Sequence, residues 1–172
     1  RAERRERSAG HRPARAHQRE HGALRVARLD DPAAAGHFGR AIENGAAACG
    51  DALRRGERVA VLFVDTFNGS FDSENAWAAA QVLQAAGYAL HTVTKDGGHH
   101  CCGRTWLSAG MVDEAKARAG ALIDALLPLA QAGVAVVGLE PSCLLTLRDE
   151  ALVMGLGDKA RDVAAQALLF EE

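Results

Sequence analysis

The sequence has few large side chains and no long apolar segment. Aromatic residues make up 5% of its 172 residues, so we expect close packing of helices on a sheet rather than a core built on large rings. No apolar run approaches the roughly 18 residues of a membrane span. The N-terminus also lacks the apolar stretch that a secretory signal needs. Together these absences predict a cytoplasmic location.

Cysteine is scarce as well, with four residues in the chain. Domains stapled by disulfides are usually shorter, secreted and denser in cysteine, and the adjacent Cys101 and Cys102 would bridge only with considerable strain. Reduced thiols that serve a metal or redox centre are the favoured interpretation. Cys49 lies in an alanine-rich stretch far from the others and is predicted to be structural.

The net charge of −2 hides an uneven distribution, because residues 1–28 carry nine arginines and three glutamates. This segment has no aromatic residue to stack on bases and no lysine, so nucleic-acid binding is not predicted. We interpret residues 1–32 as a basic, disordered arm. Residues 33–56 are interpreted as a weak helical linker, and residues 57–172 as one domain.

The alternation of apolar segments in that domain predicts an α/β fold. Three segments rich in β-branched or apolar residues are expected to be the main strands: 59–64, 89–94 and 134–139. Helical patterns follow each of them, over 73–86, from about 108, and in two pieces over 144–172; Pro128 should kink or end the second helix. The order predicts a three-layer unit with a small parallel sheet and right-handed βα crossovers, beside the N-terminal arm or helix.

Parallel strands bring their carboxyl-terminal loops to one edge of the sheet, which is where ligands bind in such folds. The loop after the second strand contains Cys101 and Cys102, and the loop after the third contains Cys143. Asp65 follows the first strand. We therefore predict a cofactor or metal site built on Cys101, Cys102 and Cys143, with Asp65 or His100 as a further candidate ligand. No catalytic residue is predicted.

Three kinds of thiol site remain open from the residues alone. Thiolates bind iron–sulfur clusters and soft metals. Zinc accepts thiolate and imidazole together, but His99 and His100 are so close to the cysteines that at most one of them would join. In the third interpretation the site holds no metal: the histidines are solvated, Asp65 caps the next turn, and the thiols are buried as small apolar side chains.

Three separated motifs resemble one family. These are the segment that begins Cys101-Cys102-Gly103, the segment Gly138-Leu-Glu-Pro-Ser-Cys143, and residues 61–68 after the first strand. Over roughly residues 57–172 the chain resembles the cysteine-rich CCG domain of iron–sulfur oxidoreductases. The closest similarity is to the C-terminal iron–sulfur region of fused flavin and iron–sulfur dehydrogenases of the D-lactate and glycolate type.

The resemblance implies electron transfer. In such enzymes a flavin domain oxidises a 2-hydroxy acid and iron–sulfur centres pass the electrons onward, so the expected partners are a flavin-containing domain or subunit and a second CCG repeat. FAD would be held by that missing domain or partner, and peripheral association with a respiratory chain is expected.

Two departures from the family pattern limit the expected ligand set. The loop after the first strand has Asp65-Thr66-Phe67 where the fuller pattern has a cysteine, and Ser142 precedes a single Cys143. Three thiolates are fewer than the four of a conventional cubane cluster. We expect a partial module without activity alone. The alternatives are a structural or docking domain without a cluster and a zinc-binding domain.

Overall fold

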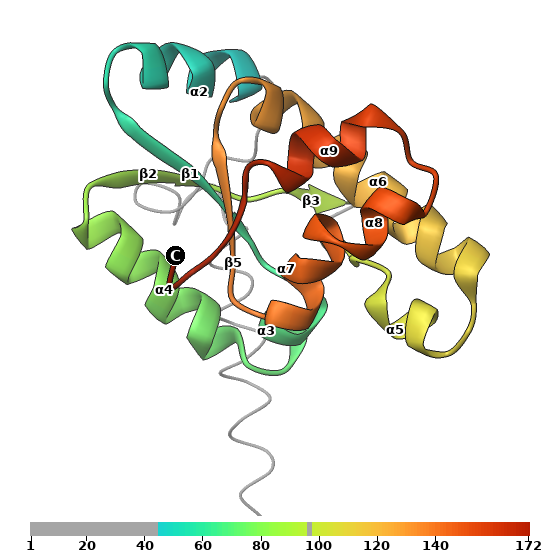
Figure 1. The fold of residues 1–172 in the computed structure, drawn as a ribbon. Coiled ribbons are helices and arrows are strands. Elements are labelled where there is room, and N and C mark those ends of the chain that lie inside the picture. The colour runs from blue at the N-terminus through green and yellow to red at the C-terminus, as the bar shows by residue number, and fades with distance from the viewer. Residues whose placement is uncertain (1–44, 96–97) are drawn as a thin grey trace, which may run out of the picture.

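The structure is a computed structural model that describes residues 45–95 and 98–172. Its centre is a four-stranded sheet in the order β2-β1-β5-β6, in which every neighbouring pair is parallel. The strands are β1 (Arg58–Phe63), β2 (Tyr88–His91), β5 (Ala135–Gly138) and β6 (Ala167–Leu169). The predicted α/β class with a small parallel sheet is confirmed (Figure 1).

Helices connect the strands. They are α2 (Gly45–Arg54), α3 (Thr66–Ser70), α4 (Ser73–Ala85), α5 (Arg104–Ser108), α6 (Val112–Gln131), α7 (Pro141–Arg148), α8 (Glu150–Val153) and α9 (Asp158–Ala164). A short antiparallel pair, β3 (Thr94–Lys95) and β4 (Gly98–His99), precedes the adjacent cysteines. None of the helices in the described part of the chain is long and apolar enough to cross a membrane.

Strand β1 is buried on both sides, and its two faces contact different helices. Val59, Val61 and Phe63 point into a cluster that includes residues of α6, α7 and α9, whereas Ala60 and Leu62 pack against the small side chains of α4. This alternation is the period of two that a pleated strand imposes. It makes the unit three layers: α4 on one face, the sheet, and the other main helices on the second face (Figure 1).

The C-terminal segment differs from expectation. Residues 144–172 were expected to form two helical pieces, but they form most of α7, then α8 and α9, and end in strand β6, which pairs with β5 from Val136 to Gly138. The apolar run at 167–169 is too short for periodicity to separate helix from strand. Pairing with the open side of β5 decides the outcome, and the sheet has four strands instead of the expected three.

Helix α6 continues through Pro128 to Gln131. Proline removes one helical hydrogen bond, but here it lies in the last turn. The helix ends at Gln131, and Gly133, with a φ of 83°, follows its C-cap. The expected kink or end is therefore displaced by about one turn.

The N-terminal predictions lie mostly outside the described residues. The basic arm over 1–32 and the first part of the linker over 33–56 belong to this region. The described part of that linker is α2, which places Cys49 in the core at 2% exposure. Its position agrees with a structural role for this thiol.

Candidate thiol site

Asp65, the first residue of the loop after β1, forms hydrogen bonds with the residues that follow it. Asp65 is 1% exposed and caps α3, because its carboxylate accepts the backbone N–H groups of Phe67 at 2.8 Å and Asn68 at 3.2 Å. Its second oxygen accepts the side-chain amide of Asn68 at 2.6 Å. Both oxygens are thus used by the loop itself, which satisfies the buried charge.

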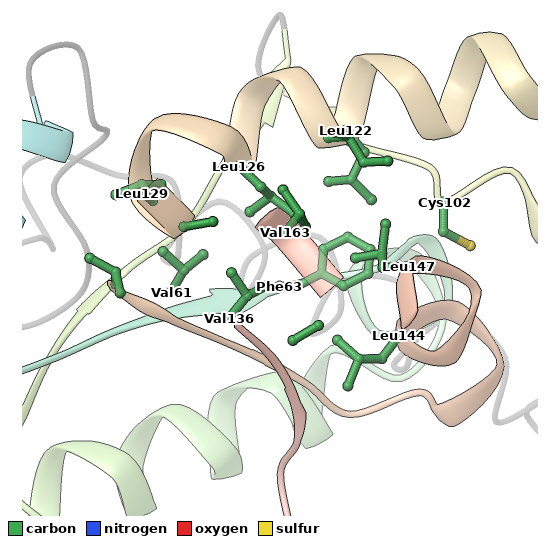
Figure 2. Packing of buried hydrophobic residues seen from close by; sticks show 14 of the residues in the cluster. Val61, Phe63, Cys102, Leu122, Leu126, Leu129, Val136, Leu144, Leu147 and Val163 are labelled. Atoms are coloured by element: carbon green, nitrogen blue, oxygen red, sulfur yellow. The ribbon is translucent and has the colours of Figure 1, made fainter. Parts of the chain in front are cut away.

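The loop before α5 holds the two adjacent cysteines in different surroundings. Cys102 is 2% exposed and belongs to the main apolar cluster, which also contains Leu147 (Figure 2). Cys101 is partly exposed. The Sγ atom of Cys101 accepts the backbone N–H of Gly103, and that of Cys102 accepts the backbone N–H of Arg104, each at 3.4 Å.

Glycine is required at position 103 for two reasons. Its φ of 88° lies in the left-handed region, and a β-carbon there would be 2.4 Å from the backbone oxygen of Ala115. The sharp turn and the contact with α6 fix where the chain leaves the cysteines.

Cys143 lies in the first turn of α7 and is 4% exposed. Glu140 caps this helix, because its carboxylate accepts the N–H of Ser142 at 3.2 Å and the Ser142 hydroxyl at 2.6 Å. Pro141 occupies the first helical position, where its missing N–H costs nothing. These local preferences hold the Cys143 thiol at the sheet edge.

Cys102 and Cys143 both belong to the main apolar cluster, and each affects the pKa of the other. The hydrogen bond from Cys143 and the backbone N–H of Arg104 lower the pKa of the Cys102 thiol, against the opposing effect of burial. The same hydrogen bond, followed by burial and the negative charges of Cys102, Asp65 and Glu140, raises the pKa of Cys143. The pKa values of the two thiols are therefore shifted in opposite directions, with that of Cys102 the lower.

His99 lies against the loop after β1. A β-carbon on Gly69 would be 2.3 Å from the Nε2 atom of His99, so the bare backbone of α3 is covered by this imidazole. His100 is 8% exposed. The three loops that the sequence placed at one edge do converge there. The contact at Gly69 was missed, because an isolated glycine in a loop has many explanations.

Arg104 and Glu150 form an ion pair that joins α5 to α8. Their side chains are 41% and 29% exposed. The backbone N–H of Arg104 contacts Cys102, while its guanidinium ties the cysteine loop to the C-terminal helices.

A hollow of about 330 Å³ opens where the loops after β1 and β5 lie next to each other. Its lining combines apolar and acidic or amide side chains: Phe67, Asn68, Asp72, Asn75, Leu139, Glu140, Phe170 and Glu171. After β1 the chain forms β2 on one side of that strand and later β5 on the other side. The edge between β1 and β5 is therefore the topological switch point, at which ligands bind in open α/β sheets. Phe170 was not anticipated, because it follows the unexpected β6.

The donors fit a complete metal centre poorly. Among residues 45–95 and 98–172, no three side chains of Cys, His, Asp or Glu are arranged so that they share one ion. Cys101 accepts an N–H from its own loop, and Asp65 is engaged as a helix cap. A cubane cluster takes four thiolates, so this chain alone does not supply a full set.

Comparisons with protein-family models, curated proteins and solved structures gave no match.

Proposed function

We propose that this chain is part of an iron–sulfur electron-transfer module of a flavin-linked 2-hydroxy-acid dehydrogenase of the D-lactate or glycolate type. The observation that supports the proposal best is the thiol pair. Cys102 and Cys143 come from separate loops that carry the CCG-like motifs, both are buried in the same apolar cluster, and each affects the pKa of the other. The resemblance of those motifs supplies the chemistry.

The module is partial. Cys101, Cys102 and Cys143 contribute at most three thiolates, and a second CCG repeat on a partner contributes the rest. The flavin-containing domain that oxidises the hydroxy acid binds the FAD, and this chain alone turns over no substrate. Reduced thiols fit a cytoplasmic setting, with peripheral association to a respiratory chain through the partner.

The test is the iron, sulfide and zinc content of the full chain. The protein is purified without oxygen and reconstituted with ferrous iron and sulfide in excess dithiothreitol, which supplies the missing thiolate. We expect bound iron, acid-labile sulfide and visible absorbance that dithionite bleaches. Cys102→Ser and Cys143→Ser should lose all three, and Cys49→Ser should keep them. A colourless wild-type protein without sulfide would overturn the proposal. Zinc at unit stoichiometry that is lost in Cys143→Ser would favour the zinc-binding alternative.

A second candidate, a docking domain without a cluster, has its own supporting observation. Phe67 and Phe71 are 45% and 77% exposed, and their ring centroids lie 6.3 Å apart at the rim of the hollow. Large aromatic side chains on a surface are typical of contact sites. The occupant we propose is a second CCG repeat.

Sedimentation of the full chain tests this docking surface. In the absence of a second CCG repeat, a second copy of the chain can occupy the docking surface. Self-association that is abolished in Phe71→Ser would therefore support the docking role. Val153 provides the control, because it is 84% exposed on α8, and Val153→Ser should leave the association unchanged. A wild-type chain that stays monomeric at high concentration would count against the docking role.

A further inference from the structure

The hollow at the edge between β1 and β5 has a lining that favours a cation. Its residues come from three segments that are far apart in the sequence: α3 and the start of α4, the loop after β5, and the residues after β6. Among the described residues that line it, three are acidic, two are amides and none is basic. Its volume of about 330 Å³ suits a small ligand or a single side chain.

The acidic groups at the hollow are not neutralised by the described part of the chain. Asp72 precedes α4, Glu171 follows β6, and both are exposed. No cationic side chain among residues 45–95 and 98–172 forms an ion pair with either of them, whereas the adjacent Glu172 pairs with Arg148. Glu140 uses its Oε1 atom to cap α7, which leaves its Oε2 atom for a ligand.

Asn68 adds a buried acceptor with a fixed orientation. It lines the hollow and is 5% exposed. A carboxylate only accepts hydrogen bonds, so the Nδ2 atom of Asn68 must face Asp65, to which it donates at 2.6 Å. The Oδ1 atom is the group left over, and no described residue donates to it. A buried acceptor without a donor is costly, so a ligand that donates an N–H group would satisfy it.

Aromatic side chains complete the lining. Phe67 on α3 and Phe170 after β6 come from different segments and both border the hollow. Ring faces attract cations. A guanidinium group is a planar cation with five N–H donors, and it is more weakly hydrated than an ammonium group and stacks on aromatic rings. It therefore matches carboxylates, an amide oxygen and rings at the same time.

We propose that the hollow is a binding site for a guanidinium group. The carboxylates of Asp72, Glu140 and Glu171 balance its charge, and the Oδ1 atom of Asn68 accepts one of its N–H groups. The site uses none of the thiols, so it does not depend on the iron–sulfur function proposed above.

A guanidinium group can come from two sources. One is a free ligand, and the other is the chain itself, since residues 1–28 carry nine arginines, all outside the described residues. Replacing these nine arginines with lysine keeps the charge but removes the planar fork. Tighter binding of an added guanidinium probe by that variant would identify the chain's own arginines as the occupant, and unchanged binding would identify a free ligand.

The test is a titration of the full chain with butylguanidinium, measured by amide chemical shifts in NMR. Butylurea has the same shape without the charge and is the comparison ligand. We expect saturable binding of butylguanidinium with the largest shifts at Asn68, Asp72 and Glu171, and no saturable binding of butylurea. Low ionic strength is used, because salt screens contacts with exposed carboxylates.

Matched variants locate the site. Asp72→Asn and Glu171→Gln each remove one charge at nearly constant size and should weaken binding about two- to fivefold. Asp149→Asn is the control, because this exposed carboxylate lies outside the lining and its loss should leave the affinity unchanged. Equal weakening by Asp149→Asn would show only general attraction to an acidic surface and would overturn the proposal. Butylurea binding as tight as that of butylguanidinium, or shifts centred elsewhere, would overturn it as well.

Discussion

The imidazole of His99 lies where a side chain on Gly69 would have to be. A β-carbon at Gly69 would approach its Nε2, Cδ2 and Cε1 atoms to 2.3, 2.4 and 2.6 Å, all closer than van der Waals contact. Helix α3 and the cysteine loop are thereby held together, because Gly69 lies in α3 and His99 precedes Cys101 by two residues. The first prediction follows from this contact.

Gly69→Ala should destabilise the fold by about 1–3 kcal/mol, the usual cost of overpacking. Urea unfolding measures the change. Gly120→Ala is the control, since its β-carbon would meet Leu156 at an ordinary 3.4 Å. If the contact with His99 is the cause, adding His99→Ala should recover most of the loss in Gly69→Ala. A double variant as unstable as Gly69→Ala alone would contradict this assignment.

Gly103→Ala should be more damaging. Both Gly103 and Gly87 have φ near +87°, at 88° and 86°, so alanine costs about 1–2 kcal/mol of backbone strain at either position. At Gly103 the new β-carbon also meets the Ala115 carbonyl at 2.4 Å, whereas nothing lies within 4 Å at Gly87.

We therefore expect the Gly103→Ala chain to lose several times the stability that Gly87→Ala loses, measured as the shift in urea midpoint at a common m-value. Equal midpoints for the two variants would show that the contact with Ala115 is unimportant.

Cys49 should react slowly with iodoacetamide in the native chain. Burial raises the pKa of this thiol, and the thiolate is the reactive form. Cys101, which is partly exposed, should be alkylated first, and Cys49 should reach the same rate only in denaturant. Mass spectrometry of a time course gives the two rates, and similar native rates would contradict the burial of Cys49.

The same pKa shift gives a dependence of stability on pH. The folded state holds the Cys49 proton more tightly than the unfolded state, so its contribution is complete below the ordinary thiol pKa and declines as the pH rises through it. Unfolding free energies should fall between about pH 8 and 10, and less steeply in Cys49→Ala. Parallel curves for the two chains would show that Cys49 does not contribute.

Sequence patterns were sufficient for the α/β class and for a parallel sheet, because the continuous apolar run at 59–64 and the valine-rich run at 134–139 are typical of strands buried on both faces. They were not sufficient for β6. Its three residues carry no periodicity, and its conformation is decided by the open side of β5.

The candidate site was likewise predicted only in part. Chain topology predicted that Cys102 and Cys143 would be neighbours. It did not predict that Cys101 would point elsewhere, because this depends on hydrogen bonds from the backbone of Gly103 and Arg104. Nor did it choose between the two expectations for Asp65, which the contacts with Asn68 resolve in favour of a helix cap.

The central claim is that Cys102 pairs with Cys143 across two loops rather than with its neighbour Cys101. Phenylarsine oxide, which binds two thiols held close together, tests this claim most directly when its stoichiometry on the reduced native chain is measured by intact mass. One equivalent should bind to the wild type and to Cys101→Ser, and none to Cys102→Ser or Cys143→Ser. Binding that survives Cys143→Ser but is lost in Cys101→Ser would contradict the account.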